Sequence, residues 1–437
     1  MWNPGAKLET VAVLAVGIFC FLGRGPAFAQ SAAPIPLPDA GELLFAPPSL
    51  GAIESLEPPS AEYTGIHAGP WTIFPTVFSG LAFNDNIYQT TTNRVADAAW
   101  RLTPSIYATN NNGINNFAVY GALDSYVYLR NSNADVVNGR VGLQDKWEIE
   151  RDLIFKFSAD LSRQTDTAQS GQVVGSTTVE PIRYWQYQTN ASLLKSFNRF
   201  FVGVGGSFVN STYDNAALTG GSSIDQSYRD LNLATFSARG GLYVGPTIYA
   251  YTEASQNTQI YYNDAAASSH GYRVVGGVGS DQLSLFKGEI YGGYQQQYYT
   301  AALGGEQNSP VFGGRVSWFP TQFITVTANA DDSFGASAAS SLTPSQVSAS
   351  NTATANLAVN YALAATWSAA AHVSFADTTY TGSSRVDHDY GAGLTLNRQI
   401  WQNLAGTFDY QLNSVQSNYV NASYVQNIVS LGLTYKY

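Results

Sequence analysis

The sequence has little charge, a single cysteine and few long apolar runs. Only 12% of its 437 residues are charged, whereas soluble domains carry about 25%. Beyond the amino terminus no stretch approaches the roughly 18 consecutive apolar residues that a membrane-spanning helix needs. Helical membrane spans are therefore excluded. The formal net charge of −10 argues against nucleic acid as a partner.

Aromatic residues and glycine are abundant instead, with 28 Tyr, 22 Phe, 8 Trp and 40 Gly. Low charge and many aromatics without long apolar runs are typical of strands in which every second side chain meets lipid. We therefore expect an all-β fold, a transmembrane antiparallel β-barrel of about 16–18 strands, with the lipid bilayer of a bacterial outer membrane as its main partner. The alternative is a soluble secreted β-propeller or lectin.

Three regions are expected along the chain. Residues 1–29 are predicted to be a signal peptide, because Lys7 precedes an apolar run and small residues precede the expected cleavage site. Residues 30–70 contain eight prolines and no Lys or Arg, which predicts a Pro-rich periplasmic linker or, as a minor alternative, a plug. Residues 71–437 are predicted to form the barrel. Cys20 lies in the removed segment behind bulky Phe19, so neither lipidation nor disulfides are expected.

The last eleven residues, 427–437, are expected to be the strand around which the barrel is organised. Val429, Leu431, Leu433, Tyr435 and Tyr437 alternate with small or polar residues, as in a strand with one face to lipid and one to a wet interior. Taken alone, this segment could also be the edge of a soluble sandwich. A chain that ends on an aromatic residue resembles the assembly signal of bacterial outer-membrane barrels, which implies the barrel-assembly machinery as a partner.

Alternation predicts eighteen strands in all. They are 71–83, 98–108, 117–130, 140–149, 153–162, 184–193, 200–208, 231–242, 248–254, 272–279, 288–294, 312–318, 324–330, 353–361, 367–375, 390–396, 404–412 and 427–437. Short and long connections alternate, and an even count places both ends on the periplasmic side. Two strands depart from a simple alternation. The phase of 231–242 is ambiguous, and Asp145 falls on the lipid-facing phase, which predicts a bulge there.

The alternation assigns side chains to the interior and to two aromatic girdles. The predicted pore-lining residues are Arg101, Tyr120, Asp124, Tyr126, Tyr128, Arg130, Lys156, Asp160, Glu253, Glu289, Arg315 and Asp409. The predicted girdle residues are Trp71, Trp100, Trp147, Trp318, Trp367, Tyr435 and Tyr437. The interior charges total seven basic against eight acidic once Arg140, Lys146, Arg163, Glu148, Asp331 and Asp389 are included. Interspersed charges of both signs predict a size filter with weak cation preference.

Several motifs together resemble a family of outer-membrane β-barrel porins of Gram-negative bacteria. They are the run Pro75–Tyr88, the turns 150–152 and 196–199, and the segments 271–274 and 287–294. The resemblance covers about residues 65–437. It implies an outer-membrane location, and some relatives are associated with exopolysaccharide secretion. It brings no catalytic or ligand residues.

The expected function is passive diffusion of small hydrophilic solutes through a porin-like channel. The alternative is a barrel accessory for exopolysaccharide secretion or surface attachment. No enzyme, cofactor or metal is expected. Asp387, His388 and Asp389 alternate faces along a strand and so do not form an oriented catalytic pair, and His372 fits a satisfied interior histidine. The clusters 84–86 and 331–332 offer oxygen ligands for Ca²⁺, but ordinary turn acidity explains them equally well.

Overall fold

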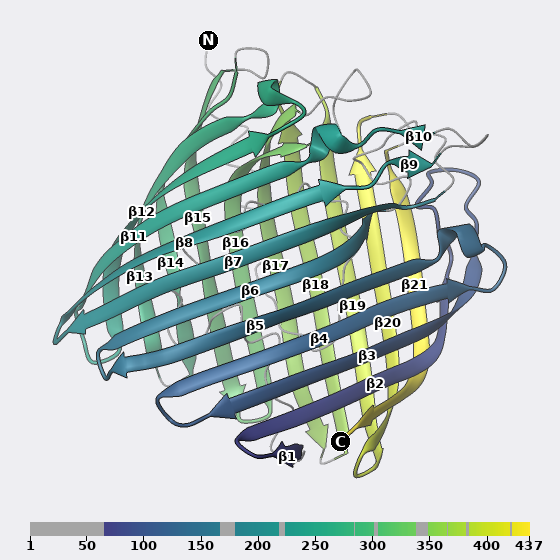
Figure 1. Ribbon diagram of the computed structural model, residues 1–437, viewed down its shortest axis with the longest axis horizontal. Helices are drawn as coiled ribbons and strands as arrows, with labels where there is room; N and C mark the ends of the chain where they lie inside the picture. Colours follow the sequence, from purple (N-terminus) through teal and green to yellow (C-terminus); the bar gives the residue numbers. More distant parts are fainter. Residues whose placement is uncertain are drawn as a thin grey trace.

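The computed structural model describes residues 65–437 except 167–179, 218–222, 284, 301–304, 338–347, 365, 382–383 and 420–421. Eighteen long antiparallel strands form one closed barrel (Figure 1). They are β2 (Trp71–Asn84), β3 (Asp97–Asn111), β4 (Asn115–Tyr128), β5 (Val136–Glu150), β6 (Leu153–Asp166), β7 (Ile182–Phe197), β8 (Phe200–Tyr213), β11 (Leu231–Tyr243), β12 (Ile248–Tyr261), β13 (Ser269–Leu283), β14 (Phe286–Tyr298), β15 (Glu306–Thr321), β16 (Ile324–Ser337), β17 (Ser348–Ala364), β18 (Trp367–Tyr380), β19 (Val386–Trp401), β20 (Leu404–Ser417) and β21 (Tyr424–Lys436).

Three short strands and three short helical turns complete the described elements. β1 (Ile66–Ala68) pairs with the start of β2, while β9 (Ala216–Ala217) and β10 (Ser223–Ile224) pair with each other. The 3-10 turns are η2 (Ser132–Ala134), η4 (Ser227–Arg229) and η5 (Ala265–Ala267). Among the described residues, no helix is long and apolar enough to cross a membrane.

The first and last long strands close the barrel. β2 pairs with β21 from Thr76↔Lys436 to Asn84↔Ile428, and the two strands lie side by side in Figure 1, purple against yellow. At one end of this seam the backbone N–H of Tyr437 donates to the carbonyl of Pro75 at 3.2 Å. The pairing of β2 with the terminal strand therefore closes the sheet into a barrel.

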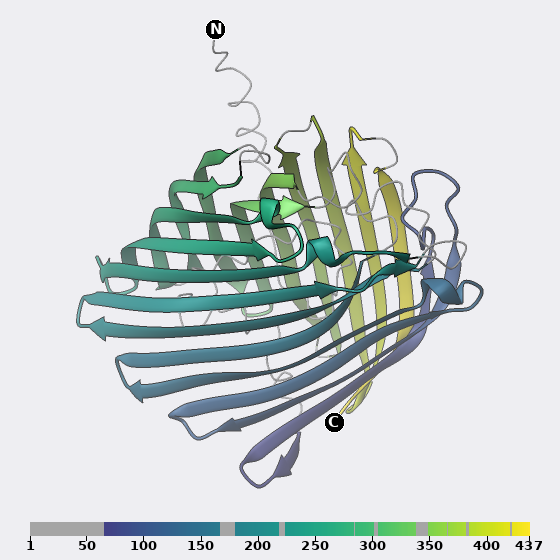
Figure 2. The same ribbon diagram turned by 45° about the horizontal axis from the view of Figure 1, so that its top comes forward.

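The two ends of the barrel differ in their connections. At one end the strands are joined by turns of two to four residues, and both the start of β2 and the end of β21 lie there. We name this the short-turn end, and the opposite one the long-loop end, which Figure 2 turns toward the viewer. Short turns are periplasmic in bacterial outer-membrane barrels. All eighteen predicted strands are confirmed, since each overlaps one long strand of the structure; the predicted strands 117–130 and 427–437 run past the ends of β4 and β21.

Most wall strands alternate between an exposed apolar face and a covered polar face. In β4 the exposed side chains include Leu123 and Val127, whereas Tyr120, Asp124 and Tyr128 are buried. In β21 Leu431 and Leu433 are exposed and Ser430 is buried. Since side chains alternate with a period of two, the exposed apolar residues lie on the outer surface and the polar ones face the interior.

The structure answers two questions that the alternation pattern left open: whether β5 has a bulge at Asp145, and which side chains of β11 face the interior. The predicted bulge at Asp145 is wrong, because its neighbours pair regularly and the register shift lies instead between Glu148 and Glu150. Asp145 stays on the outer phase with Trp147, close to the short-turn end, where a charge costs less than at the bilayer midplane. In β11, Phe236 is exposed and Arg239 buried, so Arg239 faces the interior.

Aromatic side chains border the outer surface at both ends. Trp71 and Trp367 begin their strands at the short-turn end, and Trp147, Trp318, Tyr435 and Tyr437 lie near the same end. Trp100 lies instead toward the long-loop end, where its indole N–H donates to Ser79 at 3.1 Å. Other exposed aromatics near that end include Trp185, Tyr262, Tyr272 and Tyr390, which alternation alone had not singled out.

Candidate functional site in the barrel interior

Arg101 on β3 connects the interior across the barrel seam. Its guanidinium contacts Asp124 on β4 at 3.0 Å and Asp409 on β20 at 3.6 Å. The Thr103 hydroxyl donates to Asp124 at 2.8 Å, and the Tyr126 ring centroid lies 5.0 Å from the guanidinium carbon. Arg101 and Asp124 are buried. A paired and hydrogen-bonded arginine of this kind is a fixed part of the wall.

Three further interior carboxylates are held by one repeated arrangement. A tyrosine lies across a glycine of the next strand and donates its hydroxyl proton to a carboxylate one strand beyond. The three sets are Tyr120–Gly142–Asp160 at 2.9 Å, Tyr291–Gly313–Asp331 at 2.7 Å and Tyr249–Gly279–Glu289 at 3.3 Å. Glycine is needed because a Cβ at Gly313 would lie 2.5 Å from the Tyr291 hydroxyl.

Each of these carboxylates also binds an arginine. Arg140 contacts Asp160 at 2.5 Å, Arg273 contacts Asp331 at 2.7 Å and Arg239 contacts Glu289 at 3.0 Å. Every set therefore combines a carboxylate, a guanidinium and a tyrosine over glycine. Because all three members are tied to neighbouring strands, the charges lie against the wall in fixed positions and compensate one another.

Arg239 is the largest omission from the sequence prediction. It lies between two carboxylates, Glu253 at 2.6 Å and Glu289 at 3.0 Å, and its guanidinium carbon is 4.0 Å from the centroid of the Tyr251 ring. The sequence did not assign Arg239 to the interior, because the alternation in its strand did not show which side chains face inward. The presence of Glu253 and Glu289 on neighbouring interior faces is the signal that could have resolved that phase.

The other predicted interior residues occupy different settings. Tyr128 is buried and accepts a hydrogen bond from Asn84 at 3.1 Å. Lys156 and Arg315 are partly exposed on the interior phase of β6 and β15. Arg130 lies beyond the end of β4 and is exposed, with its backbone N–H donating to Asp97 at 3.1 Å; its predicted place on the wall is therefore wrong.

The structure changes which basic residues face the interior, but the numbers of basic and acidic side chains there stay similar. Arg163 belongs to the outer surface, because it stacks on exposed Trp185 and pairs with Asp214. Arg239, Arg273 and Lys287 share the interior phase instead. Two basic residues leave the predicted set and three enter it, so the two signs stay close to equal.

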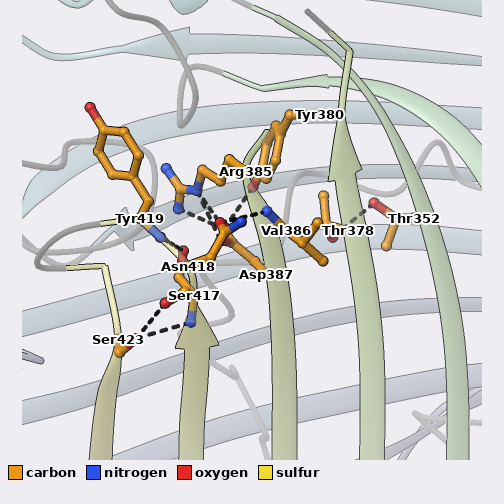
Figure 3. Close-up of polar contacts among 10 residues, drawn as sticks. All are labelled: Thr352, Thr378, Tyr380, Arg385, Val386, Asp387, Ser417, Asn418, Tyr419 and Ser423. Carbon is orange, nitrogen blue, oxygen red and sulfur yellow. Dashed lines mark hydrogen bonds and ion pairs between the residues drawn. The ribbon is translucent and has the colours of Figure 1, made fainter. Parts of the chain in front are cut away.

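A separate buried cluster closes the long-loop rim between β18 and β20 (Figure 3). Arg385 contacts Asp387 at 2.6 Å and lies between the rings of Tyr380 and Tyr419. The Tyr380 hydroxyl donates to Asp387 at 3.0 Å. His388 is on the opposite face, 3.5 Å from Asp377, so the Asp387–His388–Asp389 run does not converge on one point.

The candidate calcium clusters are engaged in other contacts. Asp85 accepts the backbone N–H and the side-chain amide of Asn427, both at 2.7 Å, and Asn86 accepts the N–H of Thr90 at 3.0 Å. These contacts connect the first long loop to β21. Across the described part of the chain, no three His, Cys, Asp or Glu side chains are grouped to hold a metal ion.

At the short-turn end, a lysine joins two adjacent turns. Lys195 donates to Glu150 at 2.6 Å and to Asp152 at 2.9 Å. The hydrogen bond from Lys195 holds the pKa of the Asp152 carboxyl below its ordinary value. Both partners are on the surface, so this contact orders the turns without contributing much stability.

The tyrosine-over-glycine arrangement is tested by adding a side chain beneath the ring. We expect Gly142→Val to lower the stability of the refolded barrel by about 1–3 kcal/mol, the usual effect of overpacking, since a Cβ there would collide with Tyr120 and lie 2.8 Å from the Ala159 carbonyl. Gly240→Val is the matched control, because nothing lies within 4 Å of its Cβ position. The heat needed to unfold each barrel in detergent is the measurement. Equal heat resistance of the two variants would contradict the arrangement.

Solved structures similar to this chain include two siderophore receptors. The siderophore receptor PirA from Pseudomonas aeruginosa is 10% identical, with a TM-score of 0.39 over 84% of this chain and 80% of its own. The siderophore receptor PiuA from Acinetobacter baumannii is 8% identical, with a TM-score of 0.44 over 85% of this chain and 82% of its own. Similarity at this level carries no information about a substrate.

Among curated proteins there is no match. A family model described as "Putative beta-barrel porin 2" matches residues 58–437. That range includes every strand of the barrel. The family and the closed barrel together support an outer-membrane location and a channel-like role. The chain belongs to the putative β-barrel porin 2 family.

Proposed function

We propose that the protein is a passive diffusion channel for small hydrophilic solutes. The supporting observation is the state of the interior charges, which are paired across strands and tied to tyrosines, as in the Arg101, Arg140, Arg239 and Arg273 clusters. Rings of one sign would favour one ion, whereas compensated charges leave mainly size selection and a transverse field.

Uncharged polar groups share the same interior surface. Asn190 donates to Ser158 at 3.1 Å, and Gln144 donates to the Tyr107 hydroxyl at 3.4 Å. Ser158, Asn190 and Gln144 are each partly exposed. Partly exposed hydroxyls and amides exchange hydrogen bonds with water and with neutral solutes at little cost, which fits permeation by hydrophilic molecules in general.

We expect weak cation preference and permeability to neutral or zwitterionic hydrophilic solutes. The measurement is the reversal potential of the refolded protein in a planar bilayer across a roughly tenfold KCl gradient, followed by swelling of liposomes in neutral sugars and amino acids. A reversal potential near the ideal value for either ion would overturn the balanced interior. No conductance, even after removal of residues 31–70, would favour an anchor or an accessory to polysaccharide secretion.

A further inference from the structure

The wall is interrupted between β15 and β16. The two strands pair from the short-turn end only as far as Gly314↔Ala330. Beyond that point β15 remains paired with β14 up to Glu306, and β16 remains paired with β17 up to Ser337. The long-loop half of the β16–β17 hairpin is therefore detached from β15, while its own ladder continues without a register shift.

Pro310 lies in the detached part of β15. It pairs with Tyr294 on β14 and has no backbone N–H to donate. Within sheets, proline is confined to edge strands, strand starts and bulges; Pro104 likewise lies where the β3–β4 pairing is interrupted, between Leu102↔Ser125 and Ser105↔Ala122. The sequence of β15 is thus consistent with an interrupted ladder at this height.

Burial shows that the detached hairpin is covered on both of its faces. Consecutive residues Ser333 and Phe334 of β16 are 8% and 7% exposed, and consecutive residues Ala349 and Ser350 of β17 are both 1% exposed. The wall strand β4 alternates instead, with Leu123 49% exposed and Asp124 2% exposed. Val326 and Thr327, in the paired part of β16, are also both covered, at 8% and 1%, so coverage agrees with an inward position and the contacts of Asp332 decide it.

Side-chain contacts give the direction in which the hairpin has moved. Gln295 of β14 is buried and faces the interior, whereas its neighbour in the sequence, Tyr294, is exposed on the outer face. The Gln295 amide donates to Asp332 at 3.1 Å. If β16 continued regularly, Asp332 would point outward, because it alternates with Asp331. An outward-phase residue can meet an interior residue two strands away only if its strand has turned inside the barrel.

We propose that the long-loop ends of β16 and β17 form the constriction of the channel and that Asp332 sets its charge preference. This inference rests on the proposed channel function. Asp331, the residue at the bend, is bound by Arg273 on β13 and Tyr291 on β14, which anchors the hairpin to the wall on the other side of β15. Asp332 accepts a hydrogen bond from the neutral Gln295, and Arg273, which pairs with Asp331, is the cation that acts on its charge. Two adjacent carboxylates therefore share one arginine, which leaves a net negative charge at the bend.

The position of the hairpin is tested by pairs of engineered cysteines that share one site. Asp332→Cys is combined either with Gln295→Cys or with Phe312→Cys, the residue that would oppose position 332 if the β15–β16 ladder continued. Cross-strand neighbours in a ladder lie about 4.5–5.5 Å apart and form a disulfide or react with a short thiol crosslinker. The one native cysteine, Cys20, is replaced by serine in both variants. Only barrels that keep normal heat-modifiable mobility are scored.

We expect crosslinking between positions 332 and 295 and none between 332 and 312. The opposite result would overturn the inward hairpin without touching the channel function, because this assay needs no conduction. Absence of both crosslinks would also overturn it. If wild-type protein does not conduct, the proposed function fails while the crosslinks still report the hairpin.

The charge role is tested by the reversal potential of single variants. We expect Asp332→Asn to shift the reversal potential toward zero and Asp332→Lys to reverse its sign to anion preference. The control is Glu148→Gln, a partly exposed wall carboxylate near the short-turn end that contacts Lys146, which should leave the reversal potential close to that of the wild type. Equal effects of Asp332→Asn and Glu148→Gln would overturn the assignment of Asp332.

Discussion

Deletion of Tyr435–Tyr437 is expected to prevent assembly of the barrel while leaving export of the chain intact. The deletion removes the pairs Val77↔Tyr435 and Thr76↔Lys436 from the closing ladder and the hydrogen bond to Pro75. It also removes two exposed aromatic side chains from the end of the outer surface. Unpaired backbone at this seam would face lipid, where each unsatisfied group costs several kcal/mol.

The readout is the amount of heat-modifiable protein in the outer-membrane fraction, compared with the total exported protein. A chain with Tyr435→Phe and Tyr437→Phe is the matched control, since it keeps both rings and every backbone hydrogen bond. We expect the control to assemble like the wild type. Normal insertion and heat resistance of the truncated chain would show that the terminal strand is not needed to organise the fold.

The substitution Leu123→Arg is expected to destabilise the inserted barrel by about 2–4 kcal/mol, the cost of an arginine near the bilayer midplane. Leu123 is exposed on the outer face of β4 and lies well inside the strand. A guanidinium there loses its water without gaining a partner. Unfolding of the barrel by denaturant in lipid vesicles measures the difference.

Ser158→Arg is the control for the same charge on the interior face. Ser158 is partly exposed on β6 and contacts Asn190, so an arginine can remain hydrated there and should change conductance more than stability. Tyr126, another interior residue, is a less suitable site for the control arginine, because its ring packs against Arg101. Equal stability of the two arginine variants would mean that the faces of the strands are misassigned.

The sequence by itself determined the strands, their number and, in most of them, which side chains meet lipid. These properties depend on the alternation of neighbours within one strand, which is visible without knowing any partner. The third strand shows this, since Leu123 and Val127 alternate with Asp124 and Tyr128 in the sequence and are exposed and buried in turn. Where alternation is weak, as around Arg239, the same reasoning could not choose a face.

Only the tertiary structure decided which interior groups meet. Tyr120 reaches Asp160 across Gly142, and Arg101 reaches Asp409 across the seam, through contacts between residues far apart in the chain. Such contacts depend on the register of several strands at once, and no single strand records that register. The inward turn of β16 is of the same kind, because it follows from where pairing with β15 stops and not from the alternation within β16 itself.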